Sequence, residues 1–200
     1  MPITKSAGLF FEAVQQGKRL IWLHTYAERM RGAGRSDEVP QGAARCLRAV
    51  SDAPSAYPED FAYIEADRNL RVGDGLFSPV NSEVWAYSVS GLQIIDSWLG
   101  YRMKRRGGKK SSPLDDIRPE HWTPRMTDEF LELLWVIEAT VALEPELASL
   151  LDRVVSGPCF SASELPAPTA TERAAPKFGM DDDRITMFDE AEAAENDEDE

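Results

Sequence analysis

The chain is poor in the residues that metal sites and disulfide-bonded domains need. Its 200 residues include two cysteines, Cys46 and Cys159, and two histidines, His24 and His121. The cysteines lie far apart and form neither a Cys-x-x-Cys pair nor a Cys/His cluster, which argues against structural zinc and against a disulfide framework. We therefore expect no metal and no cofactor.

Long apolar runs are missing as well. No stretch approaches the roughly 18 apolar residues of a membrane-spanning helix. The apolar run near the N-terminus stops at Glu12, which is too early for the core of a signal peptide. These absences predict a soluble, cytoplasmic protein that has no membrane partner.

Familiar catalytic motifs are also absent. The sequence contains no HExxH, GxSxG, P-loop or GxGxxG pattern. His24 lies in an amphipathic stretch and His121 lies in a loop between two prolines, so we interpret both as structural residues rather than proton carriers. We expect no catalytic residue in this chain, and hence no enzymatic activity of its own.

Positive charge is scarce overall but concentrated in one segment. The formal net charge of −13 argues against a nucleic-acid binder. However, residues 178–200 hold eleven acids and one base, and the other 177 residues carry a net charge of only −3. Within that nearly neutral body, six of the nine residues 102–110 are Lys or Arg. The charge of the whole chain therefore hides one strongly basic segment.

Hydrophobic periodicity predicts several helices. Helical spacing of apolar residues covers 9–30, where a Gly-Ala-Gly sequence at 32–34 should end the helix, and then about 92–101. A third helix should begin at Thr127, and a fourth should begin at Pro145, because proline is favoured in the first helical position.

Short extended runs lie between these helices. Turn-forming residues separate four candidate strands at 61–65, 69–72, 76–77 and 83–89, and a short helix is possible at 43–50. Prolines and then acids fill the region from 162 onward, a composition typical of disorder. We predict an α+β fold, with helices packed on a small, mostly antiparallel sheet. This domain spans residues 1–161, and a disordered linker and acidic tail span 162–200.

The basic segment is the strongest functional signal. Its glycines allow close approach of the backbone to a ligand, and its serines add hydroxyl donors of the kind that contact DNA phosphates. Four aromatic residues lie just before it, and core packing is the favoured interpretation for them over base stacking; they are Trp85, Tyr87, Trp98 and Tyr101. A solvated charged loop is the alternative for the segment itself. The predicted DNA-binding residues are Tyr101, Arg102, Lys104, Arg105, Arg106, Lys109, Lys110, Ser111 and Ser112.

Several separate sequence segments follow one another in an order that matches a known family. They include VWAYSVSG at 84–91, IDSWLGYR at 95–102 and SSPLDDI at 111–117, with further pieces at 20–29 and 122–145. Together they resemble the C-terminal specificity domain of type ISP restriction-modification enzymes. Those are large single-chain proteins that join a nuclease, a helicase-type translocase, an adenine methyltransferase and a target recognition domain. The resemblance extends over about residues 9–158.

This resemblance implies sequence-specific recognition of double-stranded DNA, mainly through the major groove, without local catalysis. The catalytic motifs of the larger enzymes, such as an Asn-Pro-Pro-Tyr type tetrapeptide, do not occur here. Two hypotheses follow. The chain is either a DNA-recognition module, or a protein-interaction subunit or remnant of a split enzyme. In the second case it binds DNA only with a separately encoded adenine methyltransferase or helicase-nuclease chain.

Overall fold

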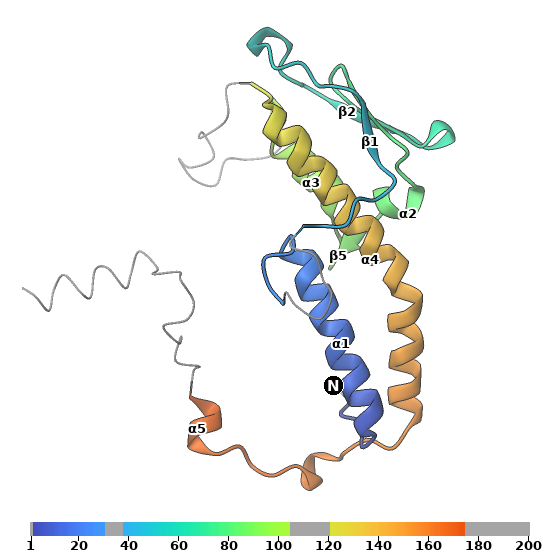
Figure 1. Cartoon of the computed structure of the whole chain (residues 1–200), viewed down its shortest axis with the longest axis vertical. Coiled ribbons are helices and arrows are strands. Elements are labelled where there is room, and N and C mark those ends of the chain that lie inside the picture. Colours follow the sequence, from blue (N-terminus) through green and yellow to red (C-terminus); the bar gives the residue numbers. More distant parts are fainter. Residues whose placement is uncertain (1, 31–37, 105–120, 175–200) are drawn as a thin grey trace, which may run out of the picture. The chain divides into compact units, whose positions relative to one another are not determined.

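A 33-residue helix, α4 (Pro124–Ser156), connects the elements of the larger part of the chain (Figure 1). The computed structural model describes residues 2–30, 38–104 and 121–174, and the chain divides into the units Met1–Cys159 and Phe160–Glu200. The Thr123 side chain caps the start of α4 by accepting a hydrogen bond from the Met126 N–H, and Gly157 follows its last turn.

The predicted break between a third and a fourth helix is wrong, because Pro145 lies inside α4. A proline in a helix interior removes one hydrogen bond and crowds the preceding turn, which costs about 3 kcal/mol. Leu143 before it and Leu147 after it pack in the same hydrophobic cluster, together with residues of the first helix. Burial of this continuous apolar face favours one long helix over two short ones.

A four-stranded antiparallel sheet packs against the first half of α4. Its spatial order is β1-β4-β3-β2. Its buried side chains include Leu70, Val72 and Phe77, and the Phe77 ring meets Phe130 of α4 edge-on, with 4.9 Å between ring centroids. The strands are β1 (Arg45–Arg48), β2 (Phe61–Ile64), β3 (Asn69–Val72) and β4 (Gly75–Ser78).

The α+β class and three of the four predicted strands are confirmed. The possible helix at 43–50 is instead the edge strand β1. The predicted strand at 83–89 is largely wrong, since the chain there forms the short helix α2 (Ser82–Trp85) and only then the strand β5 (Ser88–Val89). Over so few residues, the alternation of apolar and polar side chains does not distinguish a strand from one turn of helix.

A two-residue turn joins β5 to β6 (Leu92–Gln93) and leads directly into α3 (Ile94–Gly100), close to the predicted helix at 92–101. Both turn residues, Ser90 and Gly91, have positive φ values of 52° and 83°. Such a turn suits the right-handed twist of a tight hairpin.

The first helix, α1 (Ala7–His24), ends six residues before the predicted boundary. The Tyr26 N–H donates to the Leu23 carbonyl and the Ala27 N–H to the Trp22 carbonyl, at 3.0 and 2.9 Å. This hydrogen-bond pattern is a Schellman motif, which usually has glycine at the position that Tyr26 occupies. The Gly-Ala-Gly sequence at 32–34 suggested a later end because no glycine marks the true one.

Helices α1 and α4 run antiparallel (Figure 1). Arg153, near the end of α4, pairs with Glu12 in the first half of α1, and Thr140, at the middle of α4, contacts His24, the last residue of α1. The Lys5 N–H also donates to the Pro158 carbonyl at 2.8 Å, which joins the start of α1 to the end of α4. A second buried cluster fills the space between them and consists of Trp22, Leu23, Ala27, Val136 and Leu143.

The smaller unit contains two short elements, η4 (Ala162–Glu164) and α5 (Ala170–Arg173), in the segment for which disorder was predicted. Ser161 and Glu164 form a capping box at the start of η4. Residues 175–200 of the predicted tail lie outside the described residues. No helix among residues 2–30, 38–104 and 121–174 is long and apolar enough to cross a membrane.

The segment before β1 is held on α4 by two side chains, Trp135 and Glu138, which we call the α4 clamp. The Glu138 carboxylate accepts hydrogen bonds from the N–H groups of Ala43 and Ala44, at 2.6 and 3.1 Å, and Trp135 Nε1 donates to the Ala44 carbonyl at 2.9 Å. A Cβ atom on Gly42 would lie 1.9 Å from Glu138 Oε2 and 2.8 Å from Trp135 Cδ1. The clamp therefore requires glycine at position 42.

Gly42→Ala should lower the free energy of unfolding by about 1–3 kcal/mol, the usual range for an overpacked site, as measured by urea denaturation. Gly17→Ala is the matched control, because a Cβ atom on Gly17, in the interior of α1, would meet no atom within 4 Å. That control should gain up to about 1 kcal/mol from helix propensity. A Gly42→Ala protein as stable as the wild type would contradict the clamp.

His24 provides a second prediction, on pH. The Thr140 hydroxyl donates to the Val136 carbonyl at 2.7 Å, so it accepts from His24 Nε2 at 3.1 Å. Partial burial of the imidazole lowers the pKa of His24, although the residue as a whole is exposed. Below the ordinary histidine pKa of about 6.5, the unfolded chain takes up a proton that the folded chain resists, so stability should fall as the pH drops through this region.

The measurement is the free energy of unfolding at about pH 7.5 and about pH 5.5, a window that spans the titration of histidine. His24→Gln, which keeps a donor but cannot titrate there, should show a smaller fall than the wild type. His121→Gln serves as the matched control and should retain the full fall. Equal falls in wild type and His24→Gln would contradict this role.

Candidate nucleic-acid interface

The predicted basic segment begins where α3 ends, and its first arginine lies against an aromatic ring. The Arg102 guanidinium lies 3.6 Å from the centroid of the Trp98 ring, and it donates a hydrogen bond to the Trp98 carbonyl at 3.2 Å. Trp98 itself stacks on Phe130 at 5.0 Å and meets the buried Trp122 edge-on at 6.2 Å. Packing in the core therefore fixes the orientation of the Trp98 ring, over which Arg102 lies.

Two further predicted site residues are placed by the structure. The side chain of Tyr101 is 62% exposed. Lys104 is anchored to the segment before β2, because its N–H donates to the Pro58 carbonyl at 2.8 Å and its Nζ lies 2.9 Å from Glu59 Oε1. The end of α3 therefore presents an aromatic ring, a stacked guanidinium and a paired ammonium within four consecutive residues.

The remaining predicted site residues lie outside the described part of the chain. These are Arg105, Arg106, Lys109, Lys110, Ser111 and Ser112. Their assignment to DNA contacts rests on the sequence alone and stays a prediction.

Core packing, the favoured interpretation for the aromatic residues before the basic segment, is confirmed for Trp85, Tyr87 and Trp98 and is wrong for Tyr101, which is exposed. Trp85 stacks on Tyr63, with 5.1 Å between ring centroids, and meets Phe61 edge-on at 6.3 Å. Trp85, Tyr87 and Trp98 are all partly buried against the main core. Their rings pack against the core next to the candidate interface, so they are not free to stack on bases.

Other arginines of the sheet region are engaged by neighbouring groups. Arg71 forms a two-point contact with Asp60 at 3.0 and 3.1 Å, and this contact holds the pKa of the Asp60 carboxyl below its usual value. Arg48 donates to the Asp74 carbonyl, and Arg45 donates to the Ala44 carbonyl at 2.8 Å. These contacts attach each of the three arginines to a neighbouring carboxylate or backbone carbonyl.

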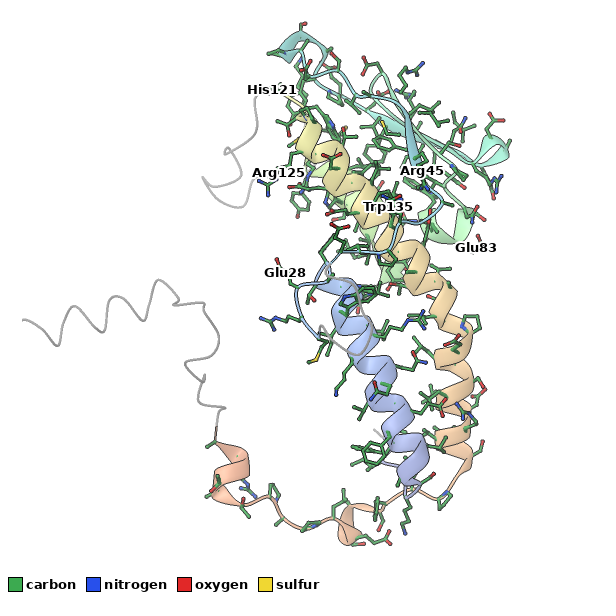
Figure 2. The ribbon with its side chains drawn as sticks, in the orientation of Figure 1. Glu28, Arg45, Glu83, His121, Arg125 and Trp135 are labelled. Atoms are coloured by element: carbon green, nitrogen blue, oxygen red, sulfur yellow. The ribbon has the colours of Figure 1, made fainter. Side chains whose placement is uncertain are left out.

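Tyr26, in the turn after α1, is 41% exposed and is not among the predicted site residues. Partial burial raises the pKa of the Tyr26 phenol, Glu132 raises it further, and Arg102 acts in the opposite direction. In Figure 2, Glu28 in the turn after α1 and Arg125 near the start of α4 lie on one side of the view, and Arg45 and Glu83 lie on the other.

The candidate catalytic groups do not assemble into a site in the described residues. His24 is bonded to Thr140, in keeping with its structural interpretation. Cys46 and Cys159 are both free thiols, and burial raises the pKa of Cys46. Over 2–30, 38–104 and 121–174, no three His, Cys, Asp or Glu side chains come together in a way that could hold a metal ion.

Comparison with known proteins gives one family. A family model described as the type ISP C-terminal specificity domain matches residues 1–133. The matched region includes α1, the four-stranded sheet, α2, α3 and the first turns of α4. Neither the curated proteins nor the solved structures contain a significant match.

Proposed function

The chain belongs to the type ISP C-terminal specificity domain family, and we propose that it recognises a specific sequence in double-stranded DNA for a restriction-modification system. The family match carries this proposal, because a specificity domain in such a system implies recognition of a DNA target. The match is to a recognition domain rather than a catalytic one. We propose that cleavage and methylation belong to another chain or region, and that this module uses no cofactor.

The end of α3 supports a contact with DNA. The Arg102 guanidinium is held over the Trp98 ring, and its planar fork of donors matches either a phosphate or the O6 and N7 atoms of guanine. The basic segment that continues from Arg102 supplies further cations for phosphates. Since the body of the chain is nearly neutral, this segment determines where a polyanion approaches.

Removal of two cations from the segment should flatten the salt dependence of DNA binding. Each lost phosphate contact changes the slope of log K against log[salt] by about 0.9, so Arg105→Ala with Lys109→Ala should change it by about 1.8. The measurement is titration of labelled random-sequence duplexes at several salt concentrations. Equal affinity and slope in the variant and the wild type would show that the segment does not contact DNA.

The matched control for this test is Lys18→Ala with Arg19→Ala. Both residues are exposed on α1, and Arg19 Nη1 lies 3.9 Å from Glu146, a weak surface ion pair. This double variant changes the net charge by the same amount, and we expect it to leave the salt slope unchanged. The comparison separates a local contact from a general effect of net charge.

A second candidate function is favoured by an exposed apolar face on α1. Phe10, Val14, Gly17 and Ile21 share one helix face by their spacing, and we call them the α1 outer stripe. Phe10 is 49% exposed and Ile21 is 41% exposed. Solvent-exposed apolar stripes of this kind mark protein interaction sites. In this alternative, the stripe docks on a helix of a separately encoded adenine methyltransferase or helicase-nuclease chain, and DNA binds only to that assembly.

Phe10→Glu with Ile21→Glu should abolish co-purification with the methyltransferase or helicase-nuclease chain encoded by a neighbouring gene. Thermal unfolding should change little, because both side chains face solvent. The matched control is Leu151→Glu with Val155→Glu on α4, two apolar residues of similar exposure outside the stripe. If the wild type does not co-purify with such a chain, or if the stripe variant still does, the alternative is wrong.

A further inference from the structure

The start of the basic segment is fixed to the folded core from two sides. Met103, which precedes Lys104, and Tyr57, which precedes Pro58, are both buried in the main core. Next to these anchors, the Lys104 N–H donates to the Pro58 carbonyl at 2.8 Å. The backbone of Lys104 is therefore held against the segment before β2.

That segment is itself attached to the sheet. The Gly73 N–H, in the turn between β3 and β4, donates to the Asp60 carbonyl at 2.9 Å, and the Asp60 carboxylate pairs with Arg71 of β3. A Cβ atom on Gly73 would lie 3.2 Å from the Pro58 ring, so the turn and the segment pack closely. Glu59 lies between Pro58 and Asp60, and the backbone is anchored on both sides of it.

The first lysine of the basic segment pairs with this carboxylate. Lys104 Nζ lies 2.9 Å from Glu59 Oε1, a distance typical of a charge-assisted hydrogen bond. The two side chains are 44% and 49% exposed, so other anions can also reach the ammonium. Exposed pairs are usually weak, in part because two long side chains must be held in one geometry. Here the backbone of both residues is already fixed, so less freedom is lost when the pair forms.

A negative charge at Glu59 is not needed to attach the segment. The Pro58 carbonyl already holds the Lys104 backbone, and a glutamine side chain also offers an oxygen that accepts from an ammonium. The charge instead works against DNA binding, because the Glu59 carboxylate neutralises Lys104 before any phosphate approaches.

We infer that Glu59 is an internal competitor for the phosphate that Lys104 is proposed to contact. The inference rests on the proposed function, since it assumes that the basic segment faces DNA. A duplex must displace the Glu59 carboxylate before Lys104 neutralises a phosphate, which weakens binding to every sequence alike. Weak non-specific binding suits a recognition module, because non-specific sites far outnumber the specific one.

The test uses the full chain and a pool of random-sequence DNA duplexes at several salt concentrations. Glu59→Gln should bind about two- to fivefold more tightly at low salt, the range expected for removal of an exposed ion pair. The slope of log K against log[salt] should become steeper by up to about 0.9, because no carboxylate is left to take up a cation when Lys104 binds a phosphate. Lys104→Ala should bind more weakly than the wild type, with a shallower slope.

The double variant Glu59→Gln with Lys104→Ala distinguishes competition for one lysine from a general effect of charge. If Glu59 acts through Lys104, Glu59→Gln should give little or no gain in affinity when Lys104 is already alanine. General repulsion between the carboxylate and DNA would give the same gain on both backgrounds.

Asp60→Asn is the matched control. It removes one negative charge from the adjacent residue, but the cation that loses its partner is Arg71 of the sheet rather than a member of the basic segment. We expect a smaller gain in affinity than for Glu59→Gln, and a salt slope equal to that of the wild type. The thermal unfolding midpoint of Glu59→Gln should match that of the wild type, because the pair is exposed.

The possible failures are distinguishable. If Glu59→Gln binds duplexes with the affinity and slope of the wild type, or if its gain persists in the double variant, the inference is overturned and the proposed function stands. An equal gain in Asp60→Asn would also overturn it, because net charge alone would then explain the result. Absence of duplex binding by both the wild type and Glu59→Gln at low salt would overturn the proposed function itself.

Discussion

The contact between the α4 clamp and the segment at 42–44 is the interaction on which the larger unit depends. A carboxylate that accepts two backbone N–H groups forms charge-assisted hydrogen bonds, which are stronger than neutral ones. This contact attaches the edge strand β1 to α4, and β1 in turn pairs with β4. Without it, the sheet would still pack on Phe130 through Phe77, but its edge would have no polar attachment to the helix.

The same helix supports the proposed interface. Phe130 of α4 contacts the sheet through Phe77 and contacts α3 through Trp98. The Arg102 guanidinium in turn lies over the Trp98 ring. A guanidinium fixed in this way loses less side-chain freedom on binding than a free surface arginine. The position of the cation is therefore a consequence of core packing, although the cation itself is at the edge of the fold.

Local chemistry explains which parts of the fold could be predicted from the sequence. The strands β2, β3 and β4 are bounded by turn residues such as Gly73, so short-range patterns suffice to find them. The interior position of Pro145 could not be predicted, because burial of α4 against another helix decides it. The early end of α1 could not be predicted either, because a tyrosine occupies the position in the turn where glycine is usual. For the proposed interface, the sequence indicated Arg102 and Lys104 through their charge. It could not indicate that Lys104 pairs with Glu59, because these two residues meet only in the folded chain.

The continuity of α4 through Pro145 has a functional consequence. The part of α4 before Pro145 packs on the sheet and α3, with the residues proposed to contact DNA. Helix α1, with the outer stripe, packs on α4 on both sides of the proline, through Val136 and Leu143 before it and Leu147 after it. A break at the proline would release the contacts of α1 with Leu147 and Arg153 and leave only those before it. One continuous helix keeps both sets of contacts, so a catalytic chain docked on the stripe, as in the proposed alternative, would be held in a defined orientation relative to the bound duplex. The proposed function needs this property, because a module that acts by placing another active site at a chosen sequence must hold that site in a fixed orientation.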